Sequence, residues 1–143
     1  MNDLAIARPH IAAMSSATID KVRTLEAIVG AMPQIAIRTD HVFHAGVYAR
    51  TVLIPAGAVI TGVLIKIPTI LIVNGAAIVH TEGGPIELHG YHVLQAAAGR
   101  KQALVALTDT HLTMIFASDA CDPDAAEREF TDEINNLMSR KEA

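Results

Sequence analysis

The sequence is poor in aromatic residues. Phe, Tyr and Trp together make up 3% of the 143 residues, and tryptophan is absent. The aromatic positions are Phe43, Tyr48, Tyr91, Phe116 and Phe130. Proteins that bind single-stranded nucleic acid stack the bases on aromatic side chains, so this composition argues against such a function.

Positive charge is also scarce. The chain has 11 Lys and Arg residues against 15 Asp and Glu residues, which gives a formal net charge of −4. The closest approach to a basic run is Arg100-Lys101. Because duplex DNA is bound by many lysines and arginines that neutralise its phosphates, the sequence predicts no nucleic-acid partner.

Disulfides and membrane segments are not indicated either. Cys121 is the single cysteine, so no intrachain disulfide can form. The first residues lack a basic segment followed by an apolar run, which argues against a secretion signal. The most apolar stretch, residues 52–79, is interrupted by prolines, glycines and a lysine, which is unlike a bilayer helix. We expect a protein of a reducing compartment with no membrane partner.

Aliphatic side chains are abundant instead. Hydrophobic residues make up 51% of the chain and charged residues 18%, so the chain must fold around a core. Its length is that of a single domain. We expect an N-terminal arm and short helix over residues 1–38, a β-domain over 39–118 and a C-terminal helix over 119–143.

Two segments have helical patterns. Over residues 18–29, apolar residues recur at steps of three and four, with Thr18 as the expected N-cap and Gly30 as the stop. Near the end of the chain, Asp122 is an expected N-cap and Pro123 suits the first helical position. The apolar stripe of this second helix is Ala126, Phe130, Ile134 and Leu137, with Arg140 and Lys141 at its C-terminal end.

The middle of the chain consists of short β-rich runs separated by turn residues. The expected strands are 35–38, 47–54, 59–65, 70–73, 76–80, 86–89, 91–94, 104–107 and 111–117. Asn74-Gly75, between two apolar runs, predicts a two-residue hairpin. Many short strands at this spacing predict a sandwich or barrel.

Residues that carry chemistry do not form a convincing site. His41 and His44, like His89 and His92, are three apart and so point to opposite faces of a strand. Neither pair suits a metal site, although Glu82 or Glu87 would be the carboxylate to complete one. Cys121 has no histidine near it in the sequence, and no serine lies in a Gly-x-Ser-x-Gly turn. We therefore expect no catalytic, cofactor-binding or metal-binding residues.

A family resemblance is carried by turn motifs in a fixed order. They are the run from His41 to Arg50 (HVFHAGVYAR), Ile54-Pro-Ala-Gly57, Thr61-Gly62, Asn74-Gly75, Thr81-Glu-Gly83, Ala98-Gly-Arg-Lys101 and Leu107-Thr-Asp-Thr110. Over residues 39–135 the chain resembles small cupin-like jelly-roll proteins encoded by tailed phages and prophages. The resemblance implies a mainly β fold, a jelly-roll (cupin-like) double-sheet sandwich, with a short N-terminal helix and a C-terminal helix.

The chain departs from this family where metal-binding cupins carry their ligands. Their first histidine set matches residues 64–70, which here are aliphatic apart from Lys66, Pro68 and Thr69. Their later histidine matches the neighbourhood of Gln102. The resemblance therefore implies a lost metal site, with Ile65, Ile67 and Ile70 expected to fill the mouth of the barrel.

The main hypothesis is a non-enzymatic phage structural protein, a capsid decoration (cementing) subunit. It predicts contacts with the major capsid protein or other virion subunits, a homodimer or higher homo-oligomer, synthesis in the host cytoplasm and a place on the outer capsid surface. The alternative is a cupin-type metal-dependent enzyme or a small-ligand-binding module with a non-standard pocket. Its expected ligands would be His80, Glu87, His89 and His92.

Overall fold

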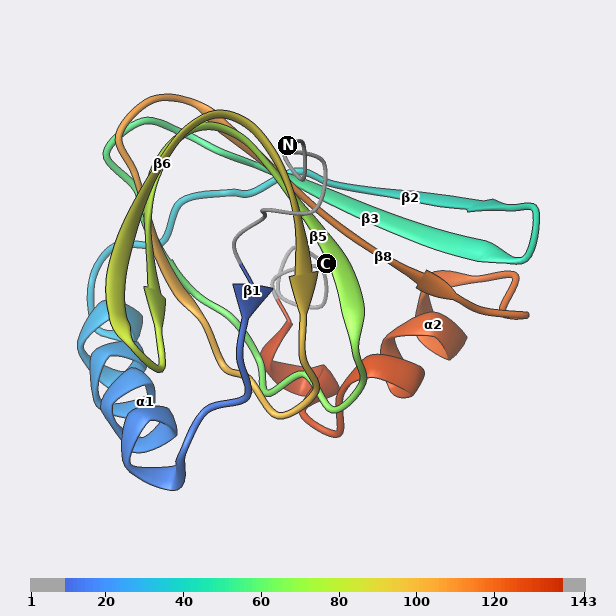
Figure 1. Ribbon diagram of the computed structural model, residues 1–143, viewed down its shortest axis with the longest axis horizontal. Coiled ribbons are helices and arrows are strands. Elements are labelled where there is room, and N and C mark those ends of the chain that lie inside the picture. Colours follow the sequence, from blue (N-terminus) through green and yellow to red (C-terminus); the bar gives the residue numbers. More distant parts are fainter. Residues whose placement is uncertain (1–9, 138–143) are drawn as a thin grey trace, which may run out of the picture.

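The computed structural model describes residues 10–137, which form one curled sheet with a helix near each end of the chain (Figure 1). The strands are β1 (His10–Ile11), β2 (Thr39–His44), β3 (Val47–Ile54), β4 (Val59–Thr61), β5 (Thr69–Thr81), β6 (Gly84–Ala96), β7 (Ala103–Ala106) and β8 (Thr110–Ala117). The helices are α1 (Ser16–Gly30), α2 (Pro123–Phe130) and the 3₁₀ turn η2 (Ile134–Asn136). The predicted mainly β architecture, with a short helix toward each end, is confirmed.

Strand β5 organises the sheet because it changes neighbours along its length. The strand order is β1-β6-β5-β8-β3-β2, and β7 pairs with both β4 and β5. One edge of β5 pairs with β8 over residues 70–74 and with β7 over residues 77–79. The sheet therefore divides beside β5 and curls over itself, which leaves an interior between its two halves.

The predicted hairpin at Asn74-Gly75 is wrong. Both residues lie inside β5 and pair with Tyr91 and Gly90 of β6. Gly75 has a φ of +147°, and a Cβ there would lie 2.5 Å from Thr110 Oγ1. The glycine is needed for this close approach to the start of β8 rather than for a turn.

The real hairpin lies several residues later. It closes at the pair formed by Thr81 and Gly84, where the Thr81 hydroxyl donates to the Gly84 carbonyl at 2.7 Å. As a result, the four short strands expected between residues 70 and 94 are two long ones, β5 and β6.

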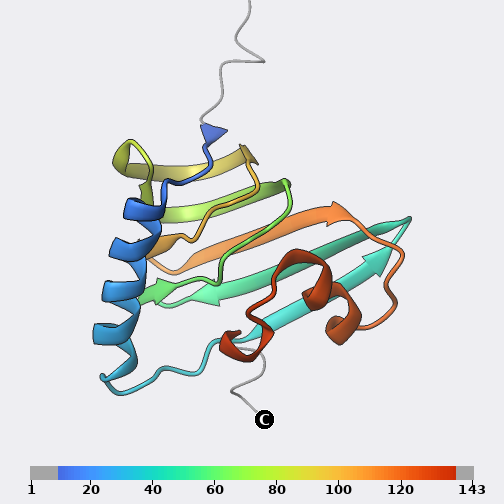
Figure 2. The same ribbon diagram turned by 90° about the horizontal axis from the view of Figure 1, so that it is seen from below.

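Helix α1 begins slightly earlier than expected. Its N-cap is Ser15, whose Oγ accepts from the Thr18 backbone N–H at 3.2 Å, so Thr18 is inside the first turn. The Ser15 N–H donates to Glu82 Oε1 at 2.8 Å, which ties the start of the helix to the β5–β6 hairpin. Figure 2 shows α1 standing across one end of the strands. The predicted short N-terminal helix is confirmed.

The C-terminal helix begins as predicted but ends early. Asp122 accepts from the Ala125 N–H at 2.9 Å, and Pro123 occupies the first position of α2. Thr131 is extended, so the helix stops at Phe130, and the chain continues to the buried Leu137 through η2. Arg140 and Lys141 lie outside the described residues. Helix α2 covers the inner face of the sheet near β2 and β3 (Figure 2).

Other boundaries also differ from the expected ones, and β2 (Thr39–His44) was not among the expected strands. Residues 35–38 form no strand, and the strand expected over 59–65 is limited to Val59–Thr61 plus an isolated bridge between Ile65 and Arg100. The arm contains β1, which pairs in parallel with β6.

Neither described helix is long and apolar enough to cross a bilayer.

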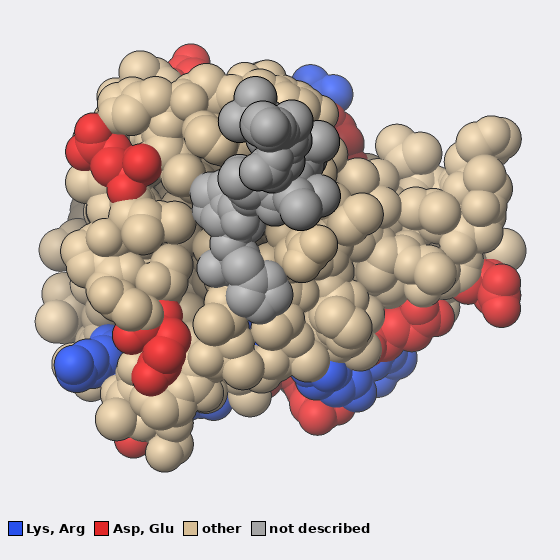
Figure 3. All heavy atoms as spheres, in the orientation of Figure 1, with Lys and Arg blue, Asp and Glu red and all other residues tan. Residues whose placement is uncertain are grey.

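Charged side chains are dispersed over the face of the molecule that Figure 3 shows. In the view of Figure 3, basic groups lie beside acidic ones and much of the remaining surface is uncharged. This arrangement agrees with the absence of a basic run in the sequence.

Candidate functional site

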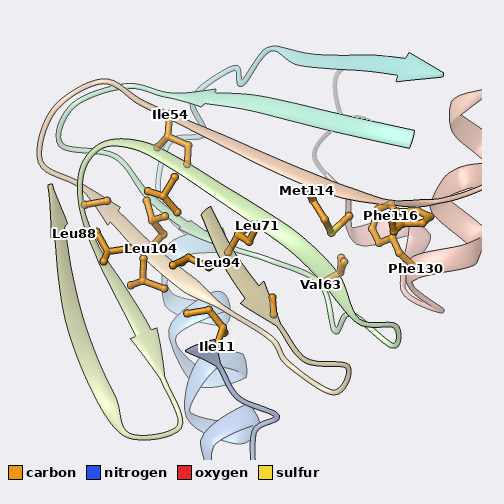
Figure 4. Close-up of a cluster of buried hydrophobic side chains, with 14 of the residues drawn as sticks. Ile11, Ile54, Val63, Leu71, Leu88, Leu94, Leu104, Met114, Phe116 and Phe130 are labelled. Carbon is orange, nitrogen blue, oxygen red and sulfur yellow. The ribbon is translucent and has the colours of Figure 1, made fainter. Parts of the chain in front are cut away.

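The interior of the curled sheet contains a cavity of about 150 Å³. Its wall is mainly aliphatic, and Figure 4 shows Val63, Leu71, Leu104 and Met114 among the side chains gathered between the strands. Strand alternation produces this wall, because every second residue of a strand faces the same side. On β3, for example, Arg50 and Val52 line the cavity, whereas the intervening Thr51 faces outward and contacts Thr113.

Arg100 is a buried cation in this mostly apolar wall. Its Nη1 donates to the Ala97 carbonyl at 2.7 Å, its Nη2 to Thr69 Oγ1 at 2.7 Å, and its Nε to Gln102 Oε1 at 3.3 Å. The residue is 1% exposed. Burial lowers the pKa of Arg100 to about 10, so the group still carries its charge at neutral pH. It forms no ion pair with any carboxylate in the described part of the chain.

A second guanidinium, that of Arg50, lines the cavity from β3. Its Nη1 donates to Glu127 Oε2 of α2 at 2.8 Å, and both side chains are buried. The guanidinium also lies over the ring of Phe130, 5.5 Å from the centroid. Helix α2 thus supplies both the counter-charge and an aromatic face for this arginine.

Next to Arg50 lies a tyrosine–histidine pair. The Tyr48 hydroxyl is 2.6 Å from His41 Nδ1. Burial and the charge of Arg50 lower the pKa of His41, while burial raises the pKa of Tyr48. At neutral pH this pair therefore consists of a neutral imidazole and a neutral phenol.

The scarce aromatic residues are concentrated in this region. Tyr48 stacks on Phe43 at 4.8 Å between centroids and meets the edge of Phe116 at 5.4 Å. Phe116 in turn meets Phe130 at 6.0 Å. These four rings connect β2, β3, β8 and α2, so they hold α2 on the sheet, and Phe130 also lines the cavity. Tyr91 is exposed.

The metal ligands of the alternative hypothesis do not come together at the cavity. Glu87 Oε2 lies 2.6 Å from His89 Nε2, and His92 Nε2 lies 2.8 Å from the His89 carbonyl. All three belong to β6 and none lines the cavity, while His80 lies opposite Pro85 near the hairpin.

The residues present do not fit a cupin metal centre. Within residues 10–137, no three His, Cys, Asp or Glu side chains are grouped so as to hold a metal ion. The cavity wall as described also contains no His, Cys, Asp or Glu, the residues that hold such a metal. No step of any reaction is therefore assigned to a metal here.

The isoleucines expected at the barrel mouth have different positions. Ile65 lines the cavity and Ile67 packs against the core. Ile70 is 46% exposed, because it alternates with the buried Thr69 and Leu71 on β5 and faces outward. The expectation was wrong for Ile70.

Sequence reasoning also missed Arg100 as a cavity residue, since neighbouring residues alone gave no sign of its burial.

Comparisons with known proteins support the fold. No protein-family model matches the chain, and no curated protein matches it in sequence. Among solved structures, KdgF from Halomonas sp. is similar with 23% identity and a TM-score of 0.51, covering 66% of this chain and 87% of KdgF. Ectoine synthase from P. lautus has 14% identity and a TM-score of 0.51, covering 69% and 76%. A cupin superfamily protein from Desulfitobacterium hafniense has 14% identity and a TM-score of 0.47, covering 64% and 88%.

These neighbours correct the functional expectation. The prediction of a non-enzymatic protein is wrong, because it assumed a jelly roll kept for its shape, whereas the fold is shared with enzymes such as ectoine synthase. Neither KdgF nor ectoine synthase is a phage or capsid protein by its description. At these identities the similarity establishes the architecture, and the chain has a cupin-like jelly-roll fold.

Proposed function

We propose that this cupin-fold protein takes up a small, largely apolar organic molecule in its barrel, as an enzyme or as a binding module with a non-standard pocket. The observation that supports this proposal is the cavity of about 150 Å³ with its aliphatic wall. An apolar cavity of about 150 Å³ is large enough to hold benzene or xenon. Enzymatic turnover and simple binding both begin with this uptake.

The chain's own residues suit binding and orientation. The aliphatic side chains exclude water, and the guanidinium groups of Arg50 and Arg100 give the wall positive charge. In an enzyme, such fixed charges stabilise negative charge that develops during a reaction. The described wall contains no His, Cys, Ser, Asp or Glu, and Thr61 supplies its one hydroxyl group.

The uptake is tested with neutral probes. We expect xenon to occupy the cavity in pressurised crystals, and toluene to shift the NMR signals of wall methyl groups such as those of Leu71 and Leu104. Ile65→Phe, which fills the cavity, should remove both effects. Ile70→Phe is the matched control because Ile70 faces outward. If folded wild-type protein binds neither probe, the proposal is overturned.

A second candidate role, as a subunit of a homo-oligomer, is favoured by the outer face of the sheet. The outward positions along residues 47–53, 70–74 and 111–117 carry no Lys, Arg, Asp or Glu. Val47, Leu53 and Ile70 are exposed there, as is Val42 on the adjacent β2. A shallow groove lined by Val47, Ile70 and Ile115 crosses this outer face. The β2–β3 hairpin extending to the right in Figure 1 is largely uncharged in Figure 3.

We propose a second copy of the chain as the partner of this outer face. A twofold axis brings identical patches together. The outward positions of β3, β5 and β8 carry no charged side chain, so they meet their copies without like-charge repulsion, and Asp40 lies beside them on the edge strand β2. The phage hypothesis would add the major capsid protein as a further partner and the outer capsid surface as the location. Both of these stay predictions.

Sedimentation equilibrium tests whether two copies of the chain associate through this outer face. We expect a dimer for the wild type and a monomer for Ile70→Asp. Val59→Asp, at an exposed valine of β4 away from the outer face, should remain dimeric. A wild-type monomer at high protein concentration, or a dimer unaffected by Ile70→Asp, would contradict the assignment.

A further inference from the structure

Building on the proposed function, we infer that the barrel ligand is a compact organic carboxylate whose charged group pairs with Arg100. Arg100 lines the cavity and is almost fully buried. The inference rests on three properties of the site: the unpaired charge, the composition of the wall, and the volume available.

The hydrogen bonds of Arg100 are made to neutral groups. Its acceptors are a backbone carbonyl, the hydroxyl of Thr69 and the side-chain amide oxygen of Gln102. A guanidinium has five N–H donors, so these three bonds leave one N–H on each terminal nitrogen. Two N–H groups in a planar fork match the two oxygens of a carboxylate.

A buried charge without a counter-ion is unfavourable. Charges inside proteins are normally paired or bound to a ligand, because desolvation is costly. Lys101, the next residue, shows the usual solution: its Nζ lies 2.9 Å from Glu26 Oε2 and 3.6 Å from Glu133 Oε1. Arg100 has no such partner within residues 10–137, and a bound carboxylate would supply one.

The other charges around the cavity do not oppose an anion. Arg50 is the second cationic group of the wall, and Glu127 neutralises it from α2. No carboxylate is present in the described wall. The local charge is therefore positive, which attracts an organic acid and repels an amine.

Cavity size and polarity restrict the rest of the ligand. A volume of about 150 Å³ suits a body near the size of a benzene ring or a short aliphatic chain. Sugar acids are disfavoured because their hydroxyl groups would lose their water against aliphatic side chains without gaining hydrogen bonds. The ligand class is thus an aromatic or short-chain monocarboxylate.

Three probes of nearly equal shape test the charge preference on the full-length protein: benzoate, toluene and benzylamine. By isothermal titration calorimetry at neutral pH, we expect benzoate to bind at least about tenfold more tightly than toluene, the gain of a charge-assisted hydrogen bond. Benzylamine should bind more weakly than toluene. This comparison needs no variant and does not depend on any mutant folding.

Single-residue variants then test whether Arg100 is the group that binds the carboxylate. Arg100→Met keeps an unbranched apolar side chain but removes the guanidinium and its charge, so it should lose the preference for benzoate while keeping toluene binding. Arg38→Met, at an exposed arginine outside the cavity, is the control and should bind benzoate like the wild type. Benzoate binding unchanged by Arg100→Met would overturn the assignment of Arg100.

The outcomes separate this inference from the proposed function. If toluene binds and benzoate binds no more tightly, the carboxylate inference fails and the apolar binding site stands. If neither toluene nor benzoate binds to folded protein, both fail.

Discussion

The Arg50 guanidinium of β3 and the Glu127 carboxylate of α2 form an ion pair of 2.8 Å between residues 77 positions apart. Both side chains are buried, with 9% and 2% of their surface exposed. Since Arg50 also lines the cavity, this pair couples the docking of α2 to the electrostatics of the candidate site.

Removing one partner of this pair should destabilise the protein strongly. Glu127→Ala leaves the buried Arg50 without its carboxylate, and we expect a loss of about 3–5 kcal/mol in the free energy of unfolding. The double variant Arg50→Met, Glu127→Leu should recover much of that loss, because two apolar side chains leave no buried charge. Urea denaturation measures both effects.

The exposed ion pair between Lys66 and Asp132 provides the control. Its carboxylate side chain is 84% exposed, so Asp132→Ala should change the stability by no more than about 1 kcal/mol. If Glu127→Ala is as mild as this control, the buried ion pair does not hold α2 in place.

Phe130 should behave as a core residue. A surface helix would tolerate Phe130→Asp, but Phe130 is 1% exposed and packs against Phe116 and Arg50. We expect Phe130→Ala to cost about 3–5 kcal/mol and Phe130→Asp to cost more, because it buries a second carboxylate beside Glu127. Thermal unfolding followed by circular dichroism will show whether the β-domain remains folded.

Glu129 supplies the comparison for Phe130. It is the preceding, exposed residue of α2, so Glu129→Ala should leave the melting temperature nearly unchanged. A folded Phe130→Asp protein with the stability of the wild type would show that α2 is not part of the core.

Gly75 should not tolerate a side chain. A Cβ at this position would lie 2.9 Å from the Asp109 carbonyl and from Thr110 Cα, besides the contact with Thr110 Oγ1. The φ of +147° alone costs a non-glycine residue about 1–3 kcal/mol. We expect Gly75→Val to lower the unfolding free energy by more than this backbone cost, as measured by urea denaturation.

Gly30→Ala is the matched glycine substitution. Gly30 ends α1, and a Cβ there meets nothing within 4 Å, so alanine should be neutral or slightly stabilising. A Gly75→Val protein as stable as the Gly30→Ala protein would contradict the close approach of β5 to β8.

The sequence predicted local structure better than long-range contacts. The Asp122 cap and the β-rich runs depend on neighbouring residues, and both were recognised. Asn74-Gly75 has the composition of a hairpin turn, yet pairing with β6 and the approach of Thr110 keep β5 continuous. Local propensity was overridden by partners distant in the sequence.

The residues of the candidate site also depend on contacts between segments that are distant in the sequence. Arg100-Lys101 is the closest approach to a basic run in the sequence, and its neighbouring residues give no sign of burial. In the fold, both side chains are buried, Lys101 between Glu26 and Glu133 and Arg100 at the cavity. The two residues differ in their contacts with distant segments. Lys101 is paired with carboxylates, whereas Arg100 has no carboxylate partner within residues 10–137.

Added metal should have little effect on the protein. The described residues contain no group of three metal donors, and a cation stabilises a fold only when it binds the folded state more tightly than the unfolded one. We expect the melting temperature to change little on treatment with EDTA or on addition of zinc, manganese, iron or nickel. Stoichiometric metal in the purified protein, with a lower melting temperature after EDTA, would contradict this expectation.

His41 should make stability depend on pH below neutrality. Burial and the charge of Arg50 hold the pKa of His41 below its usual value, so the unfolded chain binds a proton more readily than the folded one. Stability from this group is therefore complete above about pH 6.5, the unfolded pKa, and falls as the pH decreases from there toward the folded pKa. Protonation also removes the lone pair of Nδ1 that can accept from the Tyr48 hydroxyl.

The contribution of His41 can be isolated by comparing variants. His41→Gln should lose less stability than the wild type between pH 7 and pH 5 in urea denaturation. His44→Gln, at an exposed histidine of the same strand, should keep the full wild-type dependence. Equal pH dependence in the His41→Gln and wild-type proteins would mean that the imidazole beside Tyr48 titrates identically in the folded and unfolded chains.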